Sequence, residues 1–97
     1  ANENIEFYTK KNLEDNVTFS SQKNILILKE NFFSQSSEVV FRSLTEVIKI
    51  VGKKYYAVRG KKIDKIIDLV NTKSSFKVTL GGCIIKKVSE TVILCKE

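Results

Sequence analysis

The chain has 97 residues, of which 42% are apolar and 29% are charged, and this composition predicts one small domain with a modest hydrophobic core. Histidine is absent, which excludes a catalytic triad that depends on it, and the longest apolar runs are far below the roughly 20 residues of a membrane-spanning helix. The net charge of +6 is uneven: residues 1–48 hold five Lys/Arg and seven Asp/Glu (net −2), whereas residues 49–97 hold twelve and four (net +8).

The first half of the chain predicts one helix and two short strands. Residues 2–16 place acidic side chains early and Lys10 and Lys11 late, which suits the dipole of a helix. Residues 17–20 and 24–28 read as strands joined by a polar turn at residues 21–23. Ile25 to Leu28 is apolar on both faces, so we expect this strand to be covered from both sides.

The second half predicts two amphipathic helices and a C-terminal meander. Hydroxyl side chains at residues 34–37 favour a helix start, and apolar residues then recur on one face up to Gly52, which we expect to be the C-terminal cap. A second helix is predicted for residues 61–71, followed by strands at 76–80, 83–88 and 91–95. The expected fold is an α+β domain of about three helices with a short antiparallel β-meander at the C-terminus.

The two cysteines, Cys83 and Cys95, lie in apolar strand-like runs and form no CxxC pair. We therefore expect free, buried thiols and no metal site, although the count alone allows one disulfide. Methionine is also absent. A chain that begins at Ala1 without methionine is either processed or an excised piece, and we expect residues 1–97 to be a single domain excised from a longer protein.

Residues 52–65 carry most of the excess positive charge. The candidate nucleic-acid contacts here are Lys53, Lys54, Tyr55, Tyr56, Arg59, Lys61, Lys62 and Lys65. If a helix starts near Lys61, its first turn carries cations where the helix dipole favours acidic residues. A phosphate at this helix start would resolve the conflict, and a tyrosine of this stretch could stack on an exposed base. The alternative is an ordinary solvated loop with partly buried tyrosines.

Other candidate residues have simpler interpretations. Arg42 has Glu38 and Glu46 four residues to either side, which favours an ion pair within one helix. The Gly81–Gly82 pair lacks the surrounding pattern of a dinucleotide or phosphate loop, so a tight turn is expected there.

From Val39 onward, about 60 residues resemble the region that follows the catalytic domain in bacterial tRNA(Ile)-lysidine synthetases. The matching landmarks are Arg42-Ser43-Leu44, Val51-Gly52, Tyr56, Arg59, and Thr79-Leu80-Gly81-Gly82-Cys83 followed by an apolar strand that ends in Lys96-Glu97. Similar sequences often carry a second glycine where this chain has Lys53. The ATP-binding loop of that family does not occur in this chain.

The resemblance implies an accessory domain that binds isoleucine tRNA for a cytoplasmic ligase, which uses ATP with magnesium to convert the wobble cytidine to lysidine. The implied partners are this tRNA and the enzyme's own N-terminal catalytic domain, with no membrane. The resemblance implies no catalytic residue, metal or cofactor within residues 1–97. The alternative from a different class is a protein-interaction or scaffold module whose basic face meets an acidic partner.

Overall fold

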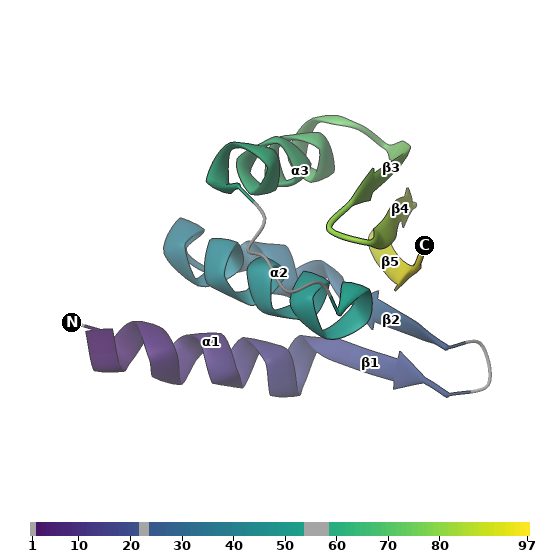
Figure 1. Ribbon diagram of the computed structural model, residues 1–97. Coiled ribbons are helices and arrows are strands. Elements are labelled where there is room, and N and C mark those ends of the chain that lie inside the picture. The colour runs from purple at the N-terminus through teal and green to yellow at the C-terminus, as the bar shows by residue number, and fades with distance from the viewer. Residues whose placement is uncertain (1, 22–23, 54–58) are drawn as a thin grey trace.

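The computed structural model describes residues 2–21, 24–53 and 59–97 and confirms the predicted α+β fold (Figure 1). Three α-helices, one 3₁₀ helix and five strands lie within these residues. In chain order they are α1 (Asn2–Asn16), β1 (Val17–Ser20), β2 (Ile25–Leu28), η1 (Glu30–Ser34), α2 (Ser37–Gly52), α3 (Gly60–Thr72), β3 (Ser75–Leu80), β4 (Cys83–Val88) and β5 (Thr91–Lys96).

The strands form one antiparallel sheet in the order β1-β2-β5-β4-β3. The C-terminal meander β3-β4-β5 is the one that the sequence predicts. The meander does not stand alone, because β5 also pairs with β2, with Leu26 opposite Leu94. This pairing joins the early hairpin β1-β2 to the end of the chain.

One face of the sheet carries the hydrophobic core. Along β2 and the first four residues of β4 and β5 every second residue is buried, and these residues cluster with the apolar faces of α2 and α3. The cluster includes Leu28, Ile85 and Leu94 from the sheet and Leu44 and Ile63 from the helices. The alternation follows from the pleat of a strand, which sends successive side chains to opposite faces.

The opposite face of β2 is less covered than predicted. Leu26 and Leu28 are buried, but Ile25 and Ile27 are only half-buried. The prediction that this strand is covered from both sides is therefore wrong. The outer isoleucines take their partial cover from neighbouring strands: Ile25 lies opposite Cys95, and Ile27 lies opposite Ile93.

Buried polar side chains hold α1 against α2 and η1. The Asn12 amide nitrogen donates to the Ser43 hydroxyl at 3.1 Å and to the Phe32 carbonyl at 3.2 Å, while Asn16 donates to the Asn12 amide oxygen at 2.8 Å. Asn12 and Ser43 are almost completely buried. A satisfied polar network of this kind permits one docking geometry, and it explains why the irregular apolar spacing of α1 still gives a packed helix.

The end of α2 packs directly on the turn between β3 and β4. Gly81 and Gly82 both have positive φ, 62° and 82°, and connect the paired residues Leu80 and Cys83. Two such residues are typical of a type I′ hairpin, so the predicted tight turn is confirmed. A Cβ atom on Gly52 would lie 1.9 Å from the Gly81 carbonyl oxygen, which means that only glycine fits there.

Gly52 is nevertheless not the cap of α2. The helix includes Gly52, and Lys53 takes the left-handed conformation with φ 53° and ψ 36° and donates its N–H to the Lys49 carbonyl at 3.0 Å. The predicted cap is thus wrong by one residue. Glycine is usually found at the left-handed residue itself. Here the contact with Gly81 requires the glycine one position earlier.

Both cysteines are free, as expected; Cys83 is buried and Cys95 is half-buried. The Cys83 thiol donates to the Ile48 carbonyl at 3.3 Å, beneath the last turn of α2. Burial raises the pKa of this thiol to about 11. Cys83 is therefore a neutral packing residue at neutral pH.

Candidate nucleic-acid interface

The start of α3 carries cations without a neutralising carboxylate. The helix begins at Gly60, close to the predicted start, and its N-cap residue Arg59 makes no side-chain capping hydrogen bond. Its first turn contains no acidic residue, and Lys61 and Lys62 are exposed. In this first turn the Lys62 N–H already donates to the Arg59 carbonyl at 3.0 Å, so the N–H groups of Gly60 and Lys61 are those that the helix itself leaves without a partner. This end combines these donors with the positive end of the dipole and three cationic side chains.

The aspartates of α3 form no ion pair within 4 Å among the described residues. Asp64 and Asp68 are exposed on the same helix. Over the part of the chain that the structure describes, the ion pairs within 4 Å are Lys11–Asp15, Arg42–Glu38 and Lys49–Glu46. None of these pairs involves a residue of α3, which leaves its cations available to a ligand.

The other end of α3 has the opposite arrangement. Lys87, in strand β4, donates from its ammonium group to the carbonyl oxygens of Val70 at 2.7 Å and Lys73 at 2.9 Å. A cation at a helix C-terminus is electrostatically favourable. The helix therefore has a stabilising cation at its C-terminus and unfavourable cations at its N-terminus. Only the cations at the N-terminus lack a structural explanation.

The predicted contacts do not form a single cluster. Lys65 lies one turn after Lys61, and both side chains are exposed on α3. Gly60 faces the ring of Phe41, because a Cβ atom there would lie 3.4 Å from the Phe41 Cζ. Lys53 lies at the far end of α2, 12 residues after Phe41, or about 18 Å along the helix axis at 1.5 Å per residue. Three further predicted contacts, Lys54, Tyr55 and Tyr56, lie outside the described residues.

Lys53 instead lies beside Lys96, at the end of β5. Both line a groove of about 220 Å³ between the end of α2 and the ends of β1, β2 and β5. The sequence reasoning did not connect Lys96 with the basic stretch. The pairing of β2 with β5 brings Lys96 here, and this non-local contact has no signature in the local sequence pattern.

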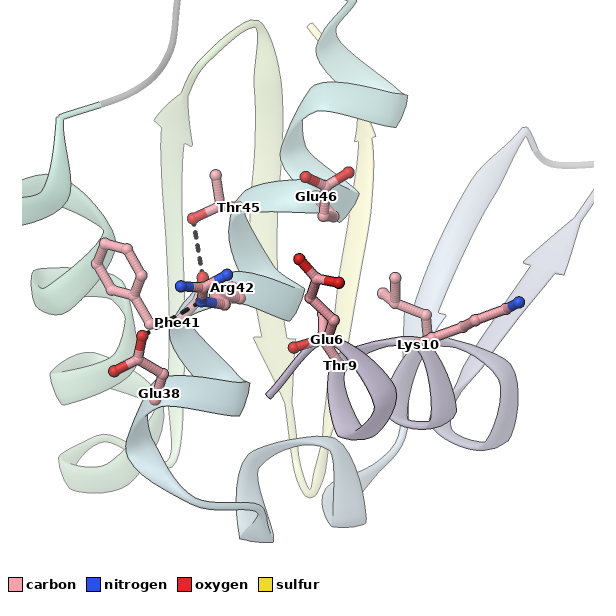
Figure 2. A pocket seen from close by; sticks show the side chains of 9 residues that line it. Glu6, Thr9, Lys10, Glu38, Phe41, Arg42, Thr45 and Glu46 are labelled. Atoms are coloured by element: carbon pink, nitrogen blue, oxygen red, sulfur yellow. Dashed lines mark hydrogen bonds and ion pairs between the residues drawn. The ribbon is translucent and has the colours of Figure 1, made fainter. Parts of the chain in front are cut away.

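A larger groove of about 570 Å³ lies between α1 and α2 (Figure 2). Its charged lining residues are Glu6 and Lys10 from α1 and Glu38, Arg42 and Glu46 from α2. Arg42 pairs with Glu38 at 3.2 Å, as the sequence predicts. Three carboxylates against two cations, one of them already paired, make this groove a poor site for phosphate.

Two further lysines face each other on the outer side of the sheet. Lys77 and Lys86 are directly opposite in the β3-β4 register, and both are exposed. Like charges at such positions are destabilising. This pair is a second place where an anion would relieve repulsion, although it lacks the helix terminus found at Arg59.

No family model matches this sequence, and no curated protein or solved structure matches it either. Among the helices that the structure describes, none is long and apolar enough to cross a membrane. Within residues 2–21, 24–53 and 59–97, no three Cys, Asp or Glu side chains gather as metal ligands.

Proposed function

We propose that this chain is an accessory RNA-binding domain that positions isoleucine tRNA for a cytoplasmic tRNA(Ile)-lysidine synthetase. The observation that carries the proposal is the start of α3, where Arg59, Lys61 and Lys62 surround a helix N-terminus without an acidic residue in its first turn. Cations at this position cost free energy in the isolated domain. A phosphate group bound there offsets that cost, because its negative charge attracts the cations and its oxygens accept hydrogen bonds from the first N–H groups of the helix.

Contacts of this type position an RNA without specifying its sequence. The choice of isoleucine tRNA rests on the resemblance to the lysidine synthetases. In that proposal ATP, magnesium and lysine are used by the enzyme's own catalytic domain, and residues 1–97 contribute affinity and orientation.

The geometry around Gly52 gives a structural role to two landmarks of the resemblance. Val51-Gly52 and Leu80-Gly81-Gly82-Cys83, two of its landmarks, meet at the contact between Gly52 and Gly81. The most specific landmark of the resemblance is therefore part of the packing, and in this proposal the basic residues bind the RNA.

The direct test is the affinity of the chain for tRNA over a range of salt concentrations. Three phosphate contacts predict a slope of log affinity against log salt of about −2 to −3. A slope near zero would refute the proposal.

Charge reversal at Lys61 and Lys62 tests the start of α3 itself. The double variant Lys61→Glu, Lys62→Glu should bind tRNA more weakly and should unfold at the same or a slightly higher temperature, because acidic residues suit the first turn of a helix. Unchanged affinity in this variant would show that the phosphate site lies elsewhere.

The second candidate function is a protein-interaction module, which the outer face of the sheet favours. Ile93 lies opposite Ile27 on one side and Lys86 on the other, and Lys86 lies opposite Lys77, so two apolar side chains lie next to two cationic ones on this face. A protein partner captured after nuclease treatment, from a chain without measurable tRNA affinity, would favour this function.

A further inference from the structure

The groove at the end of α2 exposes two large apolar side chains. Phe19, in β1, is 60% exposed and Ile50, in α2, is 57% exposed, and both line the groove. Phe19 lies opposite Leu26 in the β1-β2 register, and Leu26 is buried. The exposure of Phe19 is thus a consequence of its place on the outermost strand β1, where the ring stays open to solvent.

The same groove is cationic. Lys53 and Lys96 line it, and among the described residues no carboxylate does. Neither lysine takes part in an ion pair within the described parts of the chain. A groove lined by an aromatic ring, an aliphatic side chain and two cations complements a ligand with a flat apolar body and a negative charge.

Lys53 also adopts a conformation that a lysine disfavours. Its φ of 53° lies in the left-handed region, where glycine fits at no steric cost. The end of α2 accounts for this conformation, since helices commonly end with a left-handed residue. A lysine at this position, where glycine would fit without strain, places a cation at the groove.

The size of the groove limits the ligand. Sites for whole small molecules usually measure about 300–1,000 Å³, whereas this groove measures about 220 Å³. One planar ring system is therefore the part that enters, with its charged group outside at the lysines.

We propose that this groove binds one unpaired base of an RNA, with Phe19 and Ile50 in contact with the base and Lys53 and Lys96 in contact with neighbouring phosphates. This inference rests on the proposed RNA-binding function and adds a site for single-stranded nucleotides to it. Unpaired bases in loops and at chain ends are the parts of an RNA that can stack on an aromatic side chain. The site differs from the start of α3, because the groove lies at the C-terminal end of α2, whereas Gly60 of α3 faces Phe41 in an earlier turn of that helix.

The test compares two RNA probes by fluorescence anisotropy: a ten-nucleotide oligouridylate and a fully paired RNA duplex. Phe19→Ala should weaken binding of the oligouridylate about tenfold to hundredfold and leave binding of the duplex unchanged, since stacking needs an unpaired base. Phe19→Trp should retain the affinity, because it preserves an aromatic face.

Phe7→Ala is the matched control. Phe7 is 61% exposed, like Phe19, but it lies in α1 and does not line this groove. Its substitution should change neither affinity, and both alanine variants should show the wild-type unfolding temperature.

The outcomes separate this inference from the proposed function. If wild-type protein binds neither tRNA nor the oligouridylate, the proposed function fails. If it binds both and Phe19→Ala leaves the oligouridylate affinity unchanged, only the base site fails. Weaker binding of a polyglutamate peptide to Phe19→Ala, with oligouridylate binding unchanged, would also overturn the base site and assign the groove to an acidic protein segment.

Discussion

The close contact between Gly52 and Gly81 determines which residue fits at position 52 and where the left-handed residue that ends α2 is placed. Gly52 has no room for a side chain, because the Gly81 carbonyl occupies the space that its Cβ would need. The next residue must turn into the left-handed region to leave the helix, and here that residue is a lysine. The chain therefore places a glycine where space demands it and accepts conformational strain at the position where glycine is normally favoured.

At Gly52 we predict that alanine destabilises the domain by about 3 kcal/mol, because the new methyl group must push the β3-β4 turn away from α2. Urea or thermal unfolding measures the loss. Gly60→Ala is the control, since its Cβ would lie 3.4 Å from the end of the flexible Phe41 side chain. That variant should be neutral or more stable by up to about 1 kcal/mol, because alanine favours helix. Equal stabilities of the two variants would contradict the contact.

At Lys53 we predict opposite effects on stability and binding. Lys53→Gly should raise the unfolding free energy by about 1 kcal/mol through relief of the left-handed strain, which corresponds to about 4–8 °C in melting temperature for a domain of this size. The same variant should weaken RNA binding and reduce the salt slope by about 0.7–0.9 through the loss of one phosphate contact.

Lys53→Ala separates the two causes, because alanine removes the charge but keeps the Cβ that makes the conformation costly. It should lose the same RNA affinity without gaining stability. If Lys53→Gly gains stability and binds RNA normally, the lysine is not a contact.

Among the elements, α3 carries a favourable charge at its C-terminus and an unfavourable charge at its N-terminus with respect to the helix dipole. Lys87 satisfies two carbonyls at the C-terminal end, so the sheet stabilises the helix there. The N-terminal end has no comparable partner within the described residues. Such a difference between the two ends is expected when other parts of the fold satisfy one end of a helix and a ligand satisfies the other.

For the C-terminal end of α3 we predict that Lys87→Met destabilises the domain by about 2 kcal/mol, through loss of two charge-assisted hydrogen bonds and of the favourable dipole interaction. Thermal unfolding measures this change. Lys86→Met is the control at the neighbouring position, where the exposed lysine faces Lys77; it should be neutral within about 0.5 kcal/mol. A loss of similar size in both variants would indicate a general effect of charge.

The local elements follow from the sequence to a large extent. The helices and strands lie within a residue or two of their predicted bounds, because apolar periodicity and capping residues such as Ser36, which accepts from the Val39 N–H, are local properties. The short helix η1 and the pairing of β2 with β5 were not predicted. Both depend on contacts between distant parts of the chain, and so does the groove that joins Phe19 to Lys96.

The candidate site shows the same limit. The cations at the start of α3 could be recognised from charge and helix polarity alone. Their separation from Lys53 could not, since it follows from how α3 docks with Gly60 against Phe41. A contiguous basic stretch in the sequence therefore becomes two groups of cations on the described surface.

For the whole molecule, the distribution of charge raises the question of whether RNA responds to the overall field or to specific contacts. The second half of the chain carries a net +8 against −2 in the first half. Such a field attracts any polyanion and accelerates its association. Two double variants that remove equal charge at different places distinguish the two possibilities.

Each of two double variants lowers the net charge from +6 to +4. The first pair is Lys61→Gln with Lys62→Gln, and the second pair is Lys77→Gln with Lys86→Gln. If α3 binds phosphate, the first pair should reduce the salt slope for tRNA by about 1.4–1.8, because two contacts of about 0.7–0.9 each are lost, while the second pair should leave it nearly unchanged. Titrations at several salt concentrations measure both slopes. Equal reductions would mean that the overall field dominates, and a larger reduction for Lys77 and Lys86 would move the RNA to the outer face of the sheet.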